Sequence, residues 1–246
     1  MKKPIYSDCS FTLFQGDALT CLQTLASDSV GAVVTDPPYS SGGASLSAKQ
    51  ADPSQKYQWS GTKKTYPPML GDAKDQRSFL TWAALWLTEC WRIAQDGSPI
   101  LVFTDWRQLP VMTDAIQASN WRWLGIVPWD KRGGIPQKGR FRAQCEYVLF
   151  GSKGRLQTQP CGCLPGLYSC PVASRQKVHL TSKPLTLIKE LLAIAPEGCI
   201  VLDPFAGGGT TAVAALETGR KCVTIELSPE YAQITLDRVL AQKSST

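Results

Sequence analysis

The sequence predicts an α/β protein in which helices flank a doubly wound, mostly parallel sheet of about seven strands. Two observations predict this fold. Short runs rich in β-branched and aromatic residues alternate along the chain with longer segments of helical periodicity. Most of the short runs are apolar at every position, as in parallel strands covered on both faces. A length of 246 residues suits a single domain, residues 1–246, that is large enough for a sizeable core and for a catalytic site.

Seven strands and five helices are expected. The strands are Phe11–Phe14, Gly31–Thr35, Ile100–Phe103, Trp123–Val127, Tyr147–Phe150, Ile200–Leu202 and Val223–Ile225. The helices, in which apolar residues recur every three to four positions, are Phe79–Ala94, Leu109–Ala118, Leu185–Ile194, Thr210–Glu217 and Pro229–Leu240. Residues 40–71 and 151–178 break the alternation. Since long connections without regular structure are usually mobile binding loops, we expect a function for both.

Basic residues are concentrated in one part of the chain. The formal net charge is +6, from 26 basic and 20 acidic residues. Residues 131–183 hold ten basic residues and a single acid, Glu146, so this segment carries +9 and the remainder −3. A solvated face is the simpler explanation, but so little balancing acid is typical of a surface that meets a polyanion.

Several function classes are excluded by what the sequence lacks. It has one histidine, His179, and no G-x-S-x-G motif, and its one G-x-x-x-x-G run ends before Arg140 instead of Lys-Ser/Thr. Serine hydrolases and P-loop NTPases are therefore set aside. No apolar run approaches the ~20 residues of a membrane span, and no signal peptide is evident. We expect an intracellular protein whose nine cysteines remain thiols.

A motif typical of nucleoside cofactors lies near the C-terminus. The run Asp203-Pro-Phe-Ala-Gly-Gly-Gly-Thr-Thr211 follows a buried strand and opens a helix, and glycines at such a turn let the backbone approach a ligand. The next strand ends at Glu226, whose carboxylate can accept hydrogen bonds from two ribose hydroxyls. An NAD oxidoreductase is disfavoured, because only 37 residues follow Gly209 and His179 is the only histidine for proton transfer.

A second motif follows the strand Gly31–Thr35. The residues Asp36, Pro37, Pro38 and Tyr39 are delivered to the carboxyl end of that strand, where α/β sheets bind ligands. Because the two prolines fix φ, the Asp36 carboxylate, the Pro37 carbonyl and the Tyr39 ring are held in a fixed relation. An ordinary proline turn would not require an acid and an aromatic residue at these places.

Together the two motifs resemble those of the S-adenosylmethionine-dependent amino-methyltransferases that act on exocyclic amines of DNA bases. The catalytic motif comes first and the cofactor motif last, as in the permuted group called β. Gly16-Asp17-Ala18-Leu19, Cys145–Lys153 and His179-Leu-Thr-Ser-Lys183-Pro184 are also similar to segments of the family. The similarity runs from about residue 11 to 240 and implies a Rossmann-like fold with circularly permuted methyltransferase topology. It departs from the family at Leu180, where proline is frequent.

The resemblance implies a set of site residues. The catalytic residues would be Asp36, Pro37, Pro38 and Tyr39. S-adenosylmethionine would be held by Asp17, Ala18, Asp36, Lys183, Asp203, Phe205, Ala206, Gly207, Gly209, Thr210, Thr211, Glu226 and Leu227. From the charge pattern, the residues expected to contact DNA are Lys63, Lys64, Lys131, Arg132, Lys138, Arg140, Arg142 and Arg175. No metal is expected.

The function expected from these residues is site-specific methylation of adenine N6 in double-stranded DNA, with the target base flipped out of the helix, as in restriction-modification systems. Cytosine N4 is also possible, because both amines suit the same geometry; in the resembled family, Asp at position 36 leans towards adenine. Recognition is expected to be shared by segments 40–71 and 151–178, in a homodimer or a monomer. The resemblance also implies a cytoplasmic, nucleoid-associated protein of bacterial or phage origin.

Four further functions stay open. The chain could be a catalytically idle nucleic-acid-binding protein, although Asp36 and Glu226 are intact, and its substrate could be RNA. Cytosine C5 methylation needs a Pro-Cys nucleophile, but Pro160-Cys161 follows no strand. Finally, the chain could bind zinc through four residues whose spacing is not that of a standard zinc finger, Cys161, Cys163, Cys170 and His179.

Overall fold

The structure is a computed structural model that describes residues 2–40, 75–134, 136, 138–157, 159, 162–172 and 183–244. Most of the first predicted loop therefore lies outside the described residues. So do several residues named above, Lys63, Lys64, Cys161, Arg175 and His179.

One nine-stranded sheet forms the centre of the protein, with the strands in the order β1-β2-β9-β8-β3-β4-β6-β5-β7. Neighbours from β2 to β4 in this order are parallel, whereas β6 is antiparallel to both β4 and β5. The strands are β1 (Tyr6–Ser7), β2 (Phe11–Gln15), β3 (Ala32–Thr35), β4 (Pro99–Thr104), β5 (Arg122–Asp130), β6 (Cys145–Ser152), β7 (Tyr168–Ser169), β8 (Ile200–Asp203) and β9 (Lys221–Glu226).

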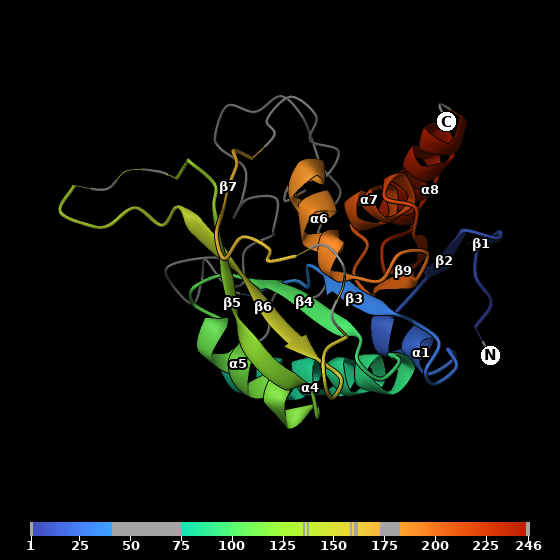
Figure 1. The fold of residues 1–246 in the computed structure, drawn as a ribbon, viewed down its shortest axis with the longest axis horizontal. Helices are drawn as coiled ribbons and strands as arrows, with labels where there is room; N and C mark the ends of the chain where they lie inside the picture. The colour runs from blue at the N-terminus through green and yellow to red at the C-terminus, as the bar shows by residue number, and fades with distance from the viewer. Residues whose placement is uncertain are drawn as a thin grey trace.

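Two groups of helices cover the two faces of this sheet (Figure 1). The helices are α1 (Ala18–Leu22), α4 (Gln76–Ile93), α5 (Leu109–Ala118), α6 (Leu185–Leu191) with the 3₁₀ turn η1 (Leu192–Ile194), α7 (Thr210–Glu217) and α8 (Pro229–Ser244). Helices α1, α4 and α5 lie on one face and α6, α7 and α8 on the other. Within the described ranges, no helix has the length and apolarity to cross a membrane.

The predicted α/β sheet is confirmed, with nine strands instead of seven. The two extra strands, β1 and β7, are two residues long, which is too short for a periodic pattern to appear in the sequence. The five expected helices are present, and two of them have the predicted bounds, Leu109–Ala118 and Thr210–Glu217. Helix α1 was not predicted, because it has only five residues.

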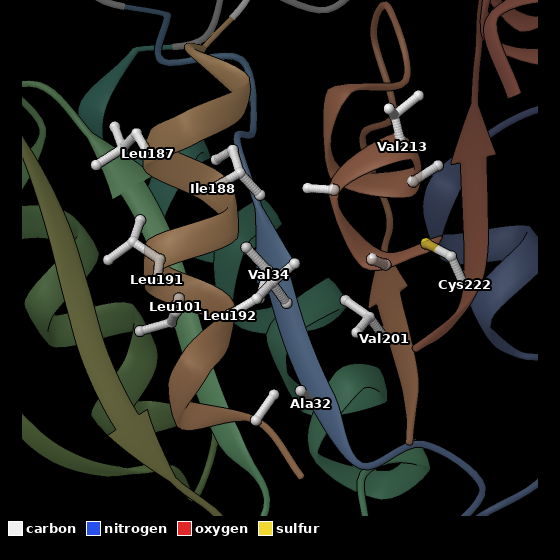
Figure 2. Packing of buried hydrophobic residues seen from close by; sticks show 14 of the residues in the cluster. Ala32, Val34, Leu101, Leu187, Ile188, Leu191, Leu192, Val201, Val213 and Cys222 are labelled. Carbon is white, nitrogen blue, oxygen red and sulfur yellow. The ribbon is translucent and has the colours of Figure 1, made fainter. Parts of the chain in front are cut away.

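Alternate residues of the central strands enter two separate cores. Val34 packs with helix α6 in one core, whereas Val33 belongs to the core beneath α4. Figure 2 shows the first core, in which Leu187, Ile188 and Leu191 of α6 lie over β3 and β4. Because both faces are covered, a central strand has no polar face, and this explains why the strands are apolar at consecutive positions.

The topology brings many chain segments together at the carboxyl ends of the parallel strands, which form one edge of the sheet running across its strands. Strands β2, β9, β8, β3 and β4 all point the same way, so their carboxyl ends share this edge. Since β6 is antiparallel to β4, its first residues also lie there, with Tyr147 paired to Thr104. Every strand that carries a predicted catalytic or cofactor residue ends at this edge.

Removing a side chain from a core should destabilise the protein strongly. Leu202 of β8 is fully buried, so we expect Leu202→Ala to lower the free energy of unfolding by about 2–5 kcal/mol, through lost burial and a residual cavity. The matched control is Leu85→Ala, because Leu85 is 51% exposed, and its effect should stay within about 0.5 kcal/mol. Urea denaturation measures both, and equal losses would contradict the assignment of Leu202 to the core.

Candidate active site

Asp36 is the first residue after β3, and two side chains hold its carboxylate. The Tyr39 hydroxyl donates to Oδ1 at 2.7 Å, and the Lys183 ammonium contacts Oδ2 at 2.5 Å. Tyr39 returns to Asp36 because Pro37 and Pro38 turn the chain immediately after the strand. Lys183 lies directly before the residue that caps α6, Pro184, so this helix fixes its position.

Glu146 completes the cluster and was not predicted from the sequence. It is the second residue of β6, and its Oε2 lies 3.2 Å from both Lys183 Nζ and the Tyr39 hydroxyl. Its other oxygen, Oε1, pairs with Lys131 Nζ at 3.1 Å. One signal could have found it, since Glu146 is the single acid among the ten basic residues of segment 131–183.

Burial and charge shift the pKa values of this cluster in different directions. Burial raises the pKa of Asp36, and the neighbouring Lys183 offsets this only in part. Burial also acts on Glu146, but Lys183 and Lys131 lower its pKa below the ordinary value. Although burial disfavours its charge, the two carboxylates raise the pKa of Lys183, and burial raises that of Tyr39 well above 10.0. At neutral pH Lys183 is therefore an ammonium ion and Tyr39 a neutral hydroxyl.

The glycine loop between β8 and α7 lies beside this cluster. The buried Asp203 closes β8, and its Oδ1 accepts hydrogen bonds from Thr35 Oγ1 at 2.7 Å and from the Phe205 amide at 3.1 Å. Thr35 is the last residue of β3, so a direct hydrogen bond joins the strand before the cofactor motif to the strand before the catalytic motif. The two residues are 168 positions apart in the sequence.

Helix α8 fixes the shape of the loop. Thr235 Oγ1 donates to the Gly207 carbonyl at 3.0 Å, and the Arg238 guanidinium donates to the Gly208 carbonyl. Gly209 has a φ of +75°, and a Cβ at this residue would lie 2.9 Å from Thr235 Cγ2. Both the backbone conformation and the close approach of α8 therefore require glycine here.

Glu226 faces the same loop from the end of β9. Its Oε2 accepts from the Gly207 amide at 2.7 Å and its Oε1 from the Ser228 amide at 2.9 Å, which leaves a lone pair on each oxygen for a ligand. Burial raises the pKa of Glu226 to about 7, and that of Asp203 to about 6. Buried acids with raised pKa values in one site are typical of functional positions.

The remaining predicted cofactor residues surround the loop. Asp17 follows β2 and caps α1 by accepting from the Thr20 amide at 2.9 Å, and the Gly16 amide donates to the Glu226 carbonyl at 2.7 Å. The Phe205 ring packs against Trp82 and Trp86 of α4. The others are either buried, as are Ala18, Ala206, Thr210 and Thr211, or exposed, as is Leu227.

The residues of this edge fit S-adenosylmethionine. A glycine cradle that a Cβ would fill suits the close approach of a nucleoside, and Glu226 keeps free acceptor positions for hydroxyl groups. The carboxylates of Asp17, Asp36 and Glu226 suit a cationic sulfonium, and Lys183 is the ammonium group that could pair with a ligand carboxylate. The chemistry of the donor set thus matches the sulfonium and the carboxylate of this cofactor.

The described basic residues of segment 131–183 have different surroundings. Lys131 is engaged with Glu146, and Arg132 donates through Nε to the Ser169 hydroxyl at 2.9 Å. Lys153 is buried and pairs with Asp28 at 2.7 Å. Only Lys138, Arg140 and Arg142, among the described residues expected at DNA, are exposed without such a partner on the β5–β6 connection, which projects from the sheet (Figure 1).

Segment 151–178 and the residues of the zinc hypothesis lie only partly within the described residues. The described part of segment 151–178 supplies the last residues of β6 and the edge strand β7, which pairs with β5. No group of three His, Cys, Asp or Glu side chains able to hold a metal occurs in the described part of the chain. The zinc hypothesis stays untested, because Cys161 and His179 lie outside it.

Comparison with known proteins agrees with this fold. The relative M.HinfI, a type II methyltransferase of Haemophilus influenzae, is 27% identical over 97% of this chain and 71% of its own length. Among solved structures, the PvuII DNA methyltransferase, a cytosine-N4-specific enzyme, superposes with a TM-score of 0.74 at 16% identity, over 99% of this chain and 94% of that one. TTHA0409 of Thermus thermophilus, solved with S-adenosyl-L-methionine, gives 0.67 at 24% identity over 94% and 95%.

A family model decides the assignment. The model described as DNA methylase, of the N6/N4 methyltransferase type, matches residues 30–161 and 164–237, which include both motifs and the lysine between them. Its members use S-adenosylmethionine as the methyl donor and act on DNA. The chain therefore belongs to the N6/N4 family of S-adenosylmethionine-dependent DNA amino-methyltransferases.

Proposed function

We propose that this protein is a site-specific adenine-N6 methyltransferase that acts on a base flipped out of double-stranded DNA. One observation carries the proposal. The Thr35–Asp203 hydrogen bond places Asp36 directly beside the glycine loop, so an amine held by Asp36 and a cofactor held by the loop would be neighbours. Holding two reactants side by side lowers the barrier of such a transfer substantially.

Asp36 and Pro37 are suited to activate an exocyclic amine. The nitrogen lone pair of adenine N6 is delocalised into the ring, which makes the amine a poor nucleophile. If its two hydrogens are donated to the Asp36 carboxylate and the Pro37 carbonyl, the nitrogen can become pyramidal and regain its lone pair. Positive charge would then develop on nitrogen facing Asp36, which is held in place before the reaction begins. The proton that the methylated amine must lose would pass to Asp36 or to water.

S-adenosylmethionine supplies an electrophilic methyl group on a cationic sulfur, and the residues of the chain hold and orient it. Glu226 would accept the ribose hydroxyls, with Asp17 beyond it at the end of β2. Lys183 would pair with the carboxylate of the methionine part. The glycine loop, fixed from behind by Thr235 and Arg238, would lie against the nucleoside.

Adenine is proposed over cytosine because the acid of the catalytic motif is Asp36. In the family that the motif resembles, Asp at this position leans towards adenine and Ser towards cytosine. A carboxylate also faces the developing positive charge more favourably than a hydroxyl. Tyr39, whose hydroxyl donates a hydrogen bond to Asp36, would stack its ring on the flipped base.

DNA would be bound through the exposed β5–β6 connection. Its free cations suit phosphate contacts, which supply most of the affinity for a duplex without reading sequence. We further propose that segments 40–71 and 151–178 share target recognition, in a homodimer, and that the enzyme methylates nucleoid DNA in the cytoplasm of a bacterium.

The decisive experiment is incubation of the protein with labelled S-adenosylmethionine and unmethylated genomic DNA, followed by nucleoside analysis and mapping of the modified positions. Label in N6-methyl-2′-deoxyadenosine at one sequence motif is the expected result. Label in N4-methylcytosine would replace the adenine assignment and keep the family. A parallel incubation uses RNA as the acceptor. Methyl transfer to RNA alone, or to neither nucleic acid, would overturn the proposal.

Asp36→Ala should abolish methyl transfer, a loss of at least about a hundredfold, because the amine loses its charged acceptor. Cofactor affinity, measured by calorimetry, should decrease far less than the rate of methyl transfer, because the other cofactor residues remain. Because the amine needs a charged acceptor, the wild-type rate should fall as the pH drops through the pKa of Asp36, which burial places above the ordinary aspartate range near 3.9. A variant that kept most of its turnover would remove Asp36 from the catalytic role.

Glu226→Ala should weaken cofactor binding by about 1.5–3 kcal/mol, since an ionised acceptor is lost. The pKa of Glu226, about 7, also predicts how affinity depends on pH. The carboxylate is protonated below that value, so the affinity of the wild type for the cofactor should decrease as the pH falls below 7. The affinity of Glu226→Gln should not change with pH in this way. Calorimetry with S-adenosylhomocysteine measures both. The exposed Glu197→Ala variant is the control, and equal affinity in all proteins would refute the site.

Replacing Lys138, Arg140 and Arg142 together by alanine should flatten the salt dependence of DNA binding. Each neutralised phosphate contributes about −0.9 to the log–log slope, so the slope should decrease by up to about 2.7. Lys221→Ala is the control, because Lys221 is exposed at the amino end of β9, at the opposite edge of the sheet. A triple variant with the wild-type slope would show that this connection is not the DNA surface.

A further inference from the structure

We propose that Glu146 is a positioning residue for methyl transfer: it shares Lys183 with Asp36 and so keeps the Asp36 carboxylate available for the substrate amine. The inference rests on the proposed function and adds a residue to it. Glu146 was not expected in the site from either sequence motif, and it reaches the site from a strand that runs antiparallel to its neighbours.

The geometry shows a lysine and a hydroxyl that each bridge two carboxylates. Lys183 Nζ lies 2.5 Å from Asp36 and 3.2 Å from Glu146, and the Tyr39 hydroxyl lies 2.7 Å and 3.2 Å from the same two groups. Glu146 therefore offers both donors of Asp36 a second acceptor. When an amine donates to Asp36, either donor can shift its hydrogen bond towards Glu146 without being left unpaired.

Such an acceptor is needed because these groups are shielded from water. The Lys183 side chain is 7% exposed and that of Glu146 17%. A buried ammonium without a partner is strongly unfavourable, so before the cofactor carboxylate is in place a Lys183 without Glu146 would stay bound to Asp36 and compete with the amine. Its positive charge would also oppose the charge that develops on nitrogen during the transfer.

The charge of the cluster supports the same role. Asp36 and Glu146 carry two negative charges, which Lys183 and Lys131 balance. If Glu146 were neutral, the cluster would have a net positive charge at the place where a sulfonium and an increasingly cationic amine must meet. Glu146 is thus the group that keeps this part of the site from repelling its own reactants.

Lys131 anchors Glu146 from the side away from the reaction. It contacts Oε1 at 3.1 Å, whereas Lys183 and Tyr39 contact Oε2, so the carboxylate is gripped through both oxygens. Lys131 follows β5 and Glu146 belongs to β6, and the paired strands keep the two residues near each other. This fixed orientation is what a positioning group requires.

The test compares Glu146→Gln with Glu217→Gln. Gln keeps the size and one acceptor of Glu but removes the charge. Glu217 is the matched control, because it also pairs with a lysine at 3.0 Å, Lys189, but lies on the surface away from the site. The readouts are the turnover number, its pH profile, and the pKa of Asp36 in the free protein, followed by carbon-13 NMR of labelled aspartate.

We expect Glu146→Gln to lower the turnover number about 30- to 100-fold, while Glu217→Gln stays within twofold of wild type. The pKa of Asp36 should fall, because a negative neighbour is removed and Lys183 pairs with Asp36 alone; the acid limb of the pH profile should move the same way. Asp36 is faced by Lys183, Glu146 and Tyr39, with Asp203 beyond. Lys183→Met should shift its pKa in the opposite direction, upwards.

Two results would overturn the inference. One is wild-type turnover in Glu146→Gln. The other is a loss of turnover with an unchanged Asp36 pKa, which would indicate a merely structural role. Both presuppose an active wild-type protein. If the wild type transfers no methyl group to any nucleic acid, the proposed function itself fails, and this result is distinct from a defect confined to the variant.

Discussion

The structure depends on the hydrogen bond by which Thr35 joins the ends of β3 and β8 through Asp203. The direct pairing of β3 with β8 brings the carboxyl ends of the two strands side by side. The bond between two buried side chains, at 2.7 Å, fixes one turn relative to the other. Asp36 and the glycine loop are placed by this pairing, although they come from distant parts of the chain.

The concentration of acids at this edge opposes folding and favours ligand binding. Burial raises the pKa values of Asp36, Asp203 and Glu226, and each negative charge adds to the effect on its neighbour. Above pH 7 the folded free protein therefore holds ionised groups that would be better solvated in the unfolded chain. A cationic ligand relieves this unfavourable interaction, so the site is prepared for a sulfonium before it arrives.

The sequence predicted those features that depend on local pattern. The apolar runs at residues 31–35 and 200–202 became central strands, because both sheet faces are covered by helices. The motifs after them were placed correctly for the same reason, since a strand must end where its turn begins. Strands β1 and β7 could not be predicted because two residues are too few for an alternating pattern. Helix α1 could not be predicted because five residues are too few to show helical periodicity.

Residues that depend on pairing between distant strands could not be predicted in this way. Lys131 is expected at DNA from its place in a basic run, and the β5–β6 register also pairs it with Glu146, which the sequence patterns do not place in the site. The pairing could not be predicted because a charge pattern gives the sum of charges in a segment and not which of them meet. Here they meet at the root of the connection that carries Lys138, Arg140 and Arg142. The cations expected to bind phosphate and the carboxylate expected to prepare Asp36 are thus held by the same pair of strands. A duplex bound by that connection would place its target base next to the site through rigid β-structure.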